Sequence, residues 1–274
     1  MNENDEDCLS EKQLTNKRNF LVIGARNVLA IGAIAAAGAI ARTTRAMADN
    51  DCDSPGDTGC SCFLRGTNIE TVAGERKVED LAIGDLLPTV FGGICPIQWI
   101  GRYGYKKSDP SKPWSKFAQP VRIIRSALAP NVPHTDLYVT QGHGLFIDGV
   151  IIPVSGLING TTIALYAADE YDELESFHIK LETHDVIHAE GAPCETLLNV
   201  DENASNFAEY LRRYGTPEAQ DLPCAPVLFD GGRRSEIRMR LSSVKSPGPL
   251  KIDIIRERLK ERAIALRSRM EAIS

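Results

Sequence analysis

Residues 59–85, GCSCFLRGTNIETVAGERKVEDLAIGD, raise the question that decides how this chain folds. Cys62 stands directly before two stretches of alternating apolar and polar residues, TNIETV and RKVEDL, which flank the turn signal Ala73-Gly74-Glu75. Such alternation around a short glycine turn predicts a β-hairpin. Cys62 is therefore a core residue that begins a strand, one half of a disulfide, or a nucleophile directed at its own peptide bond.

The middle of the chain continues in the same style. Short apolar alternations broken by Gly and Pro recur in GDLLPTVFGGICPIQWIGR, DLYVTQGHGLFIDGVIIPVSGLING and SFHIKLETHDVIHAEG. Asp148-Gly149 is a strong hairpin signal between two apolar segments. Because no long segment has a helical period, we predict a mainly β domain over residues 62–200, built as a closed or folded-over sheet.

The N-terminal residues 1–48 are typical of an export signal. The basic pair Lys17-Arg18 precedes an apolar run over residues 28–41, and Ala46-Met47-Ala48 has the small-x-small pattern of a cleavage site. The layout is similar to a twin-arginine signal with Lys in place of the first Arg. We therefore expect export to the periplasm or the extracellular space. The alternative is an uncut inner-membrane tether through residues 20–41, although the apolar run is shorter than the roughly 20 residues of a bilayer span.

Two further segments flank the β domain. Residues 49–61, acidic and rich in Asp, Gly, Ser and Pro, predict a flexible linker. Residues 201–274 predict a helical extension, with a short helix ended by Gly215 and a C-terminal amphipathic helix whose apolar face carries Ile252, Ile255, Leu259, Leu266 and Met270. We expect this helix to dock on the core, with membrane-surface contact or helix pairing as alternatives.

Charge and cysteine content exclude several functions. The net charge of −6 gives no reason to expect nucleic-acid binding, because phosphate contacts need a basic face. The seven cysteines include no CxxC pair, and the cluster at Cys52, Cys60 and Cys62 lacks the second ligand pair of a zinc site. We therefore expect no metal and no cofactor. Cys60 and Cys62 are too close in sequence to bond easily, so a disulfide in this cluster would favour the pair Cys52 and Cys60. The alternative is a disulfide between Cys62 and either Cys52 or Cys60.

A thiol at position 62 could break the chain from within by attacking the carbonyl of Ser61. The thiol must lose its proton, the developing oxyanion needs donors, and the departing nitrogen of Cys62 must be protonated. Histidine is the natural acid near neutral pH, and the chain has only five. His143 follows an apolar strand with Thr140 three residues before it, and His178 and His184 lie in FHIKLETH.

These residues resemble the Hint domain, the self-processing fold shared by inteins and hedgehog C-terminal domains, and in particular bacterial exported proteins with a single Hint domain. The likeness covers residues 62–200. It rests on CFLRGTNIETVAGERKVEDLAIGD, on the Thr-x-x-His pattern TQGH and on FHIKLETHDVIHAEG. The resemblance implies Cys62 as nucleophile, Thr140 as orienting residue, His143 as the group that protonates or polarises the scissile amide, and His184 as the late-block histidine.

The chain also departs from the family pattern. His178 stands where inteins usually have Asp, and APCETLLNV after Gly191 has no His-Asn pair, so splicing is not expected. The resemblance then implies a single-turnover N-to-S acyl shift and cleavage at Ser61–Cys62, with the chain's own N-terminal segment as substrate and no protein partner identified. The alternative is a non-catalytic envelope scaffold or binding module that uses the Hint fold.

Overall fold

The computed structural model describes residues 61–200, 207–216, 222–228 and 249–272. The predicted export signal, the predicted membrane tether and all but the last residue of the predicted linker lie outside these ranges. Among the helices that the structure does describe, none combines the length and the apolar character that crossing a bilayer requires.

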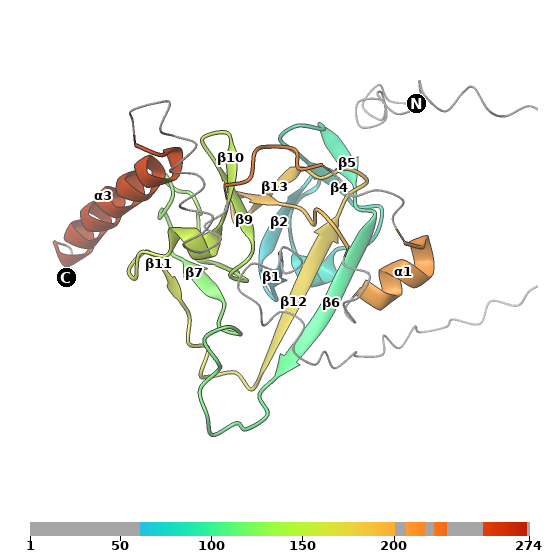
Figure 1. The fold of residues 1–274 in the computed structure, drawn as a ribbon, viewed down its shortest axis with the longest axis horizontal. Coiled ribbons are helices and arrows are strands. Elements are labelled where there is room, and N and C mark those ends of the chain that lie inside the picture. The colour runs from blue at the N-terminus through green and yellow to red at the C-terminus, as the bar shows by residue number, and fades with distance from the viewer. Residues whose placement is uncertain (1–60, 201–206, 217–221, 229–248, 273–274) are drawn as a thin grey trace, which may run out of the picture.

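Two six-stranded antiparallel sheets form the body of the protein (Figure 1). The first has the strand order β11-β7-β8-β1-β12-β6, and the second has the order β10-β9-β14-β13-β2-β3. The short strands β4 and β5 form a separate pair. The strands are β1 Phe63–Leu64, β2 Asn68–Thr71, β3 Gly74–Lys77, β4 Leu86–Pro88, β5 Ile94–Pro96, β6 Trp99–Lys106, β7 Val121–Ile123, β8 Leu137–Val139, β9 Gly144–Ile147, β10 Val150–Pro153, β11 Ile163–Leu165, β12 Glu173–Lys180, β13 Val186–Ala189 and β14 Ala192–Glu195.

Both predicted hairpins are present. Strands β2 and β3 pair from Asn68 with Lys77 to Thr71 with Gly74. The second strand ends earlier than its alternation indicated, because the chain turns into a short 3-10 helix, Val78–Asp80. Strands β9 and β10 join through Asp148 and Gly149, which both have positive φ, 51° and 78°. Positive φ at both central residues is what a tight hairpin of the type I′ class requires.

The main hydrophobic core lies between the two sheets. It joins Phe63 and Val139 of the first sheet to Ile69, Leu145 and Ile187 of the second. The alternating strands supply these side chains from their inner faces, as the period of two in each segment predicts. The prediction of a mainly β, folded-over architecture with a helical C-terminal extension is confirmed.

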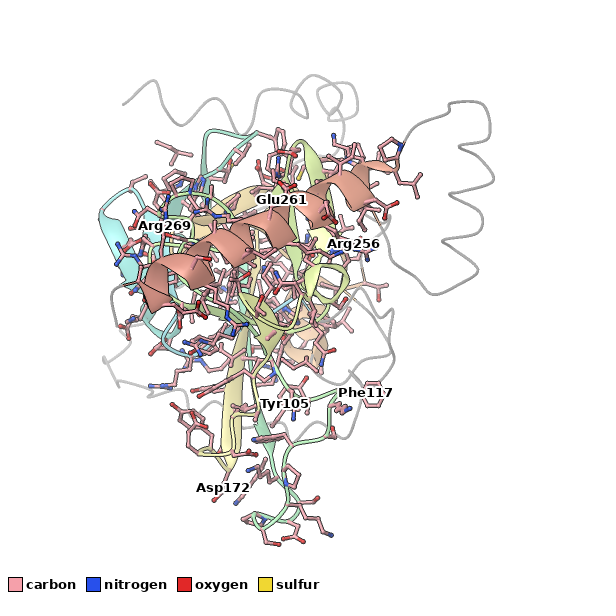
Figure 2. The ribbon with its side chains drawn as sticks, turned by 90° about the vertical axis from the view of Figure 1, so that its left-hand side faces the viewer. Tyr105, Phe117, Asp172, Arg256, Glu261 and Arg269 are labelled. Atoms are coloured by element: carbon pink, nitrogen blue, oxygen red, sulfur yellow. The ribbon has the colours of Figure 1, made fainter. Side chains whose placement is uncertain are left out.

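Two helices cover opposite flanks of the sheets (Figure 1). Helix α1, Ala208–Tyr214, lies beside β6, where Phe207 and Tyr210 pack on Trp99. Helix α3, Lys251–Glu271, lies on the far side and crosses the β core (Figure 2). Ile252, Ile255 and Leu259 are buried there, so the first part of the predicted apolar face of α3 docks on the core. Leu266 is half-buried, and the side chain of Met270 lies outside the described part of the chain.

Candidate active site around the Ser61–Cys62 peptide bond

The central position of β1 carries the Ser61–Cys62 bond into the core. Strand β1 pairs with β8 on one side and β12 on the other, with Phe63 opposite both Val139 and Phe177. Cys62 directly precedes this strand and is fully buried, and Ser61 is also buried. Cys62 has a free thiol. The alternative in which Cys62 forms a disulfide is therefore wrong.

Thr140 holds the backbone of Cys62 from both sides. The Cys62 N–H, which belongs to the scissile peptide, donates to Thr140 Oγ1 at 3.0 Å, and the Thr140 N–H donates to the Cys62 carbonyl at 3.1 Å. Thr140 directly follows β8, the neighbour of β1, so sheet pairing sets this contact. The hydroxyl thus fixes the direction in which the scissile amide points.

His143 lies in the loop that Thr140 begins, and its backbone N–H donates to the Thr140 carbonyl at 3.1 Å. The imidazole is completely buried, with its ring 4.4 Å from the ring of Phe63. Burial lowers the pKa of His143 to about 4, while Glu195 and the Cys62 backbone act in the opposite direction. Among the described residues, neither ring nitrogen has a hydrogen-bond partner. His143 is therefore a neutral imidazole beside the Cys62 backbone.

His178 makes the most direct contact with the reacting atoms. Its Nδ1 lies 2.5 Å from the Ser61 carbonyl oxygen, and its Nε2 lies 3.8 Å from Cys62 Sγ. A carbonyl oxygen only accepts, so Nδ1 carries the proton and Nε2 presents a lone pair to the thiol. Burial lowers the pKa of His178 to about 4, against the hydrogen bond to Ser61. One neutral imidazole thus touches both the carbonyl that would be attacked and the sulfur that would attack it.

The surroundings of His178 are aromatic. Phe207, just before α1, stacks on the imidazole with ring centroids 5.3 Å apart and an interplanar angle of 18°, and Tyr103 of β6 meets it edge-on at 4.9 Å. The Cys62 thiol also lies 3.9 Å from the Tyr103 hydroxyl oxygen, which is a second acceptor within reach of its one hydrogen. Burial raises the pKa of the Cys62 thiol far above its usual range, more than its contact with Thr140 lowers it.

A buried carboxylate, Glu195, holds the other side of the scissile bond. Its Oε1 accepts from Ser61 Oγ at 2.7 Å and from the Gly144 N–H at 2.7 Å. Burial opposes its charge, but hydrogen bonds from His184 and Ser61, with the nearby His143, outweigh burial and lower the pKa of this carboxyl. Glu195 therefore places a negative charge next to Ser61 and His143.

His184 reaches the site only through Glu195. Its Nδ1 accepts the backbone N–H of Cys224 at 3.0 Å, so its proton sits on Nε2, which lies 3.4 Å from Glu195 Oε2. The structure thus brings Thr140, His143 and His178 to Cys62 and leaves His184 one residue further out. Within the described ranges, no three His, Cys, Asp or Glu side chains gather closely enough to hold a metal ion.

Sequence reasoning missed Tyr103 and Glu195, and it left the role of His178 open. The alternation of Phe177 and Ile179 did predict that His178 faces away from those apolar residues. The only signal for Glu195 was a carboxylate inside the apolar segment 192–198. Neither observation identifies the contacts, because Phe207, Tyr103 and Ser61 come from distant parts of the chain.

Comparisons with known proteins found similar solved structures and one matching family model. The chain is similar in structure to the gp41-1 intein (14% identity, TM-score 0.34, 48% of this chain and 97% of the other), to a bacterial intein-like domain from Clostridium thermocellum (14%, 0.33, 50% and 98%) and to the MchDnaB-1 intein (14%, 0.31, 48% and 98%). No curated protein matches in sequence. A family model described as Hint domain matches residues 61–201, just over half of the 274 residues. The chain therefore belongs to the Hint domain family.

Proposed function

We propose that this Hint domain cleaves its own chain once, at Ser61–Cys62, through an N-to-S acyl shift. The observation that carries the proposal is the bridging position of His178, with Nδ1 on the Ser61 carbonyl oxygen and Nε2 facing the Cys62 sulfur. A base for the nucleophile and a donor for the oxyanion are the two groups that attack on an amide requires.

In the first step, Cys62 Sγ forms a bond to the Ser61 carbonyl carbon as His178 Nε2 takes the thiol proton. Proton transfer accompanies the attack, because burial raises the pKa of the thiol too far for a free thiolate to accumulate. The carbonyl oxygen gains negative charge while it accepts from His178 Nδ1, and the ring gains positive charge as it does so. Charge develops between two atoms already in contact, which limits the reorganisation needed.

In the second step, the oxyanion re-forms the carbonyl as the C–N bond breaks, and the proton that His178 took from the sulfur moves to the Cys62 nitrogen, which returns His178 to its neutral form. Thr140 Oγ1 already holds that N–H, and His143 lies beside the same backbone. His143 is neutral at the start, but the charge on Glu195 favours its protonated form, so the carboxylate supports His143 if it receives this proton and passes it to the nitrogen. The product is a thioester at Cys62, an isomer of the starting chain.

Water then opens the thioester, adding one water molecule and separating residues 1–61 from residues 62–274. An added thiol opens it in the same manner and leaves that thiol on the carboxyl end of Ser61. His184 takes no proton in this scheme, since it is held by Cys224 and Glu195. Its proposed role is to keep Glu195 in place.

The test is the intact mass of the purified full-length chain before and after incubation with a small thiol, with Cys62→Ala as control. We expect a fragment that begins at Cys62 and grows with time in the wild type and is absent in the variant. The same set of masses in both proteins would refute the proposal.

One observation favours a second candidate, a non-catalytic scaffold or binding module. Cys62 is enclosed, and its thiol has a strongly raised pKa, as a structural core cysteine has. This candidate predicts that Cys62→Ser leaves both the mass and the folding of the chain unchanged. Cleavage of a fragment from the Cys62→Ser variant would exclude the scaffold candidate.

A further inference from the structure

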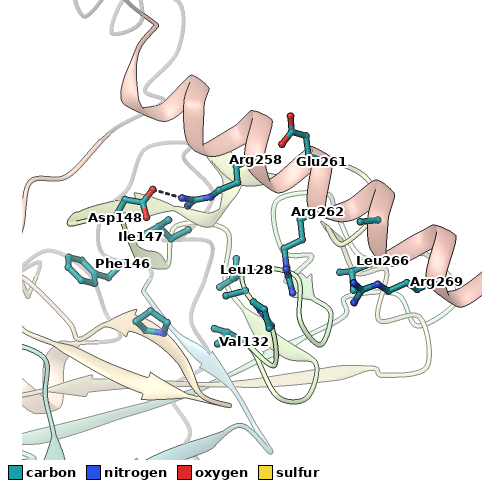
Figure 3. A pocket seen from close by; sticks show the side chains of 14 residues that line it. Leu128, Val132, Phe146, Ile147, Asp148, Arg258, Glu261, Arg262, Leu266 and Arg269 are labelled. Atoms are coloured by element: carbon teal, nitrogen blue, oxygen red, sulfur yellow. Dashed lines mark hydrogen bonds and ion pairs between the residues drawn. The ribbon is translucent and has the colours of Figure 1, made fainter.

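A cavity separates the middle of α3 from the β core (Figure 3). Its volume is about 690 Å³, and its walls come from α3, from the loop at residues 128–132 and from β9. The wall is largely aliphatic, with Leu128, Val132, Ile147 and Leu266 among its residues. The size falls in the range of small-molecule sites, about 300–1,000 Å³. The site proposed for self-cleavage uses none of these residues.

Three arginines of α3 border this cavity, and they differ in their pairing. Arg258 is neutralised by Asp148, 2.7 Å away at the hairpin turn. Arg262 donates from Nε to the Ser126 carbonyl at 2.5 Å, a neutral partner. Within the described part of the chain, no carboxylate forms an ion pair with Arg262 or Arg269.

The positive charges of the two unneutralised arginines, Arg262 and Arg269, repel each other. Burial lowers the pKa of Arg262, and the charge of Arg269 lowers it further. In Figure 3 both side chains extend from α3 toward the cavity, while Glu261 points away from it. Two cations at the rim of an aliphatic cavity are complementary in charge and polarity to a molecule with an anionic head and an apolar tail.

We propose that this cavity binds an amphiphilic carboxylate, an aliphatic chain that ends in one carboxylate group. The carboxylate would lie between Arg262 and Arg269, where guanidinium groups can donate to both oxygens. The chain would lie along Leu128, Val132 and Leu266. The site is independent of the cleavage reaction.

Titration calorimetry of the full-length chain with decanoate, below its micelle concentration, tests this site. We expect saturable binding of decanoate and at least tenfold weaker binding of decanol, which has the tail without the charge. Arg262→Gln with Arg269→Gln should weaken decanoate at least tenfold. Arg267→Gln is the matched control, because Arg267 lies on the same helix, pairs with Glu271 and is absent from the cavity wall. Equal affinity for both ligands, equal affinity in the double variant, or no binding of decanoate would overturn the proposal.

Discussion

Replacing His178 by Asn separates the two tasks that its imidazole would perform. The amide nitrogen of Asn reaches roughly as far as Nδ1 and can still donate to the Ser61 carbonyl, whereas nothing replaces Nε2, which faces Cys62 Sγ at 3.8 Å. Replacing His178 by Ala removes both groups. The two variants therefore measure the base alone and the base together with the donor.

The two contacts of His178 set the size of the rate loss expected for each variant. Loss of a positioned base slows such reactions by about 10²–10⁴. Loss of one oxyanion donor costs about 10²–10³ more. We therefore expect His178→Asn to reduce the rate of thiol-induced cleavage by at least a hundredfold and His178→Ala to reduce it by at least a further tenfold. Tyr103→Phe, which removes only the 3.9 Å contact between the thiol and the hydroxyl, should change the rate by less than tenfold.

The assay follows the fragment that begins at Cys62 by mass spectrometry after a thiol is added. Thermal unfolding of each variant identifies loss of fold, which matters because His178 stacks on Phe207. If a folded His178→Asn protein cleaves at the wild-type rate, His178 is not the base. If the Asn and Ala variants are equally slow, the hydrogen bond to Ser61 contributes nothing to the reaction.

Three other predictions concern stability and the buried charges. Burial lowers the pKa of both His143 and His178 from 6.5 to about 4, so the unfolded chain binds protons that the folded chain excludes. The free energy of unfolding should thus fall as pH drops from about 6.5 toward 4, by up to about 3 kcal/mol for each histidine at about 1.4 kcal/mol per pKa unit. Urea unfolding at pH 7 and pH 4.5 measures the fall, and a flat profile contradicts it. Glu195→Gln should slow cleavage more than tenfold and lower the pH at which His143 titrates, as followed by NMR, because the charge that raises its pKa is removed. An unchanged titration of His143 in this variant would mean that Glu195 does not influence the pKa of His143. Leu259→Ala should cost about 2–5 kcal/mol in urea unfolding, since Leu259 is a buried residue of α3, whereas the control Ile264→Ala, at a residue 69% exposed on the same helix, should cost much less. Equal losses would mean that α3 is not docked by this face.

Local patterns were enough to predict the hairpins and the fold class. The turn at Asp148-Gly149 depends on its own backbone angles, and the alternation around Gly74 depends on neighbours a few residues away. These features share one property: the interactions that determine them lie within one supersecondary unit.

The rest of the site depends on contacts between distant segments. Glu195 reaches Gly144 because Cys194 of β14 pairs with Leu145 of β9, a register that no local pattern reveals. The covering of His178 depends on Phe207, which lies outside the predicted β domain. Alternation predicts the face on which a side chain lies, but not whether a later segment buries it. The role of His178 therefore required the structure.

The burial of Cys62 is consistent with chemistry here in a way that it would not be in an enzyme with a diffusing substrate. The carbonyl to be attacked belongs to the residue before the nucleophile, so no entry path is needed, and the two reacting groups are already positioned by β1 and Thr140. Enclosure would keep water away while the oxyanion forms on the Ser61 oxygen beside His178 Nδ1, and it would strengthen that hydrogen bond. The same enclosure would protect the thioester from hydrolysis. Opening around Cys62, rather than the acyl shift, should then limit release of the N-terminal segment. Phe207→Ala, which removes the aromatic cover of His178, should therefore speed thioester hydrolysis relative to thioester formation in a single-turnover experiment. A slower hydrolysis step in a folded variant would contradict this argument.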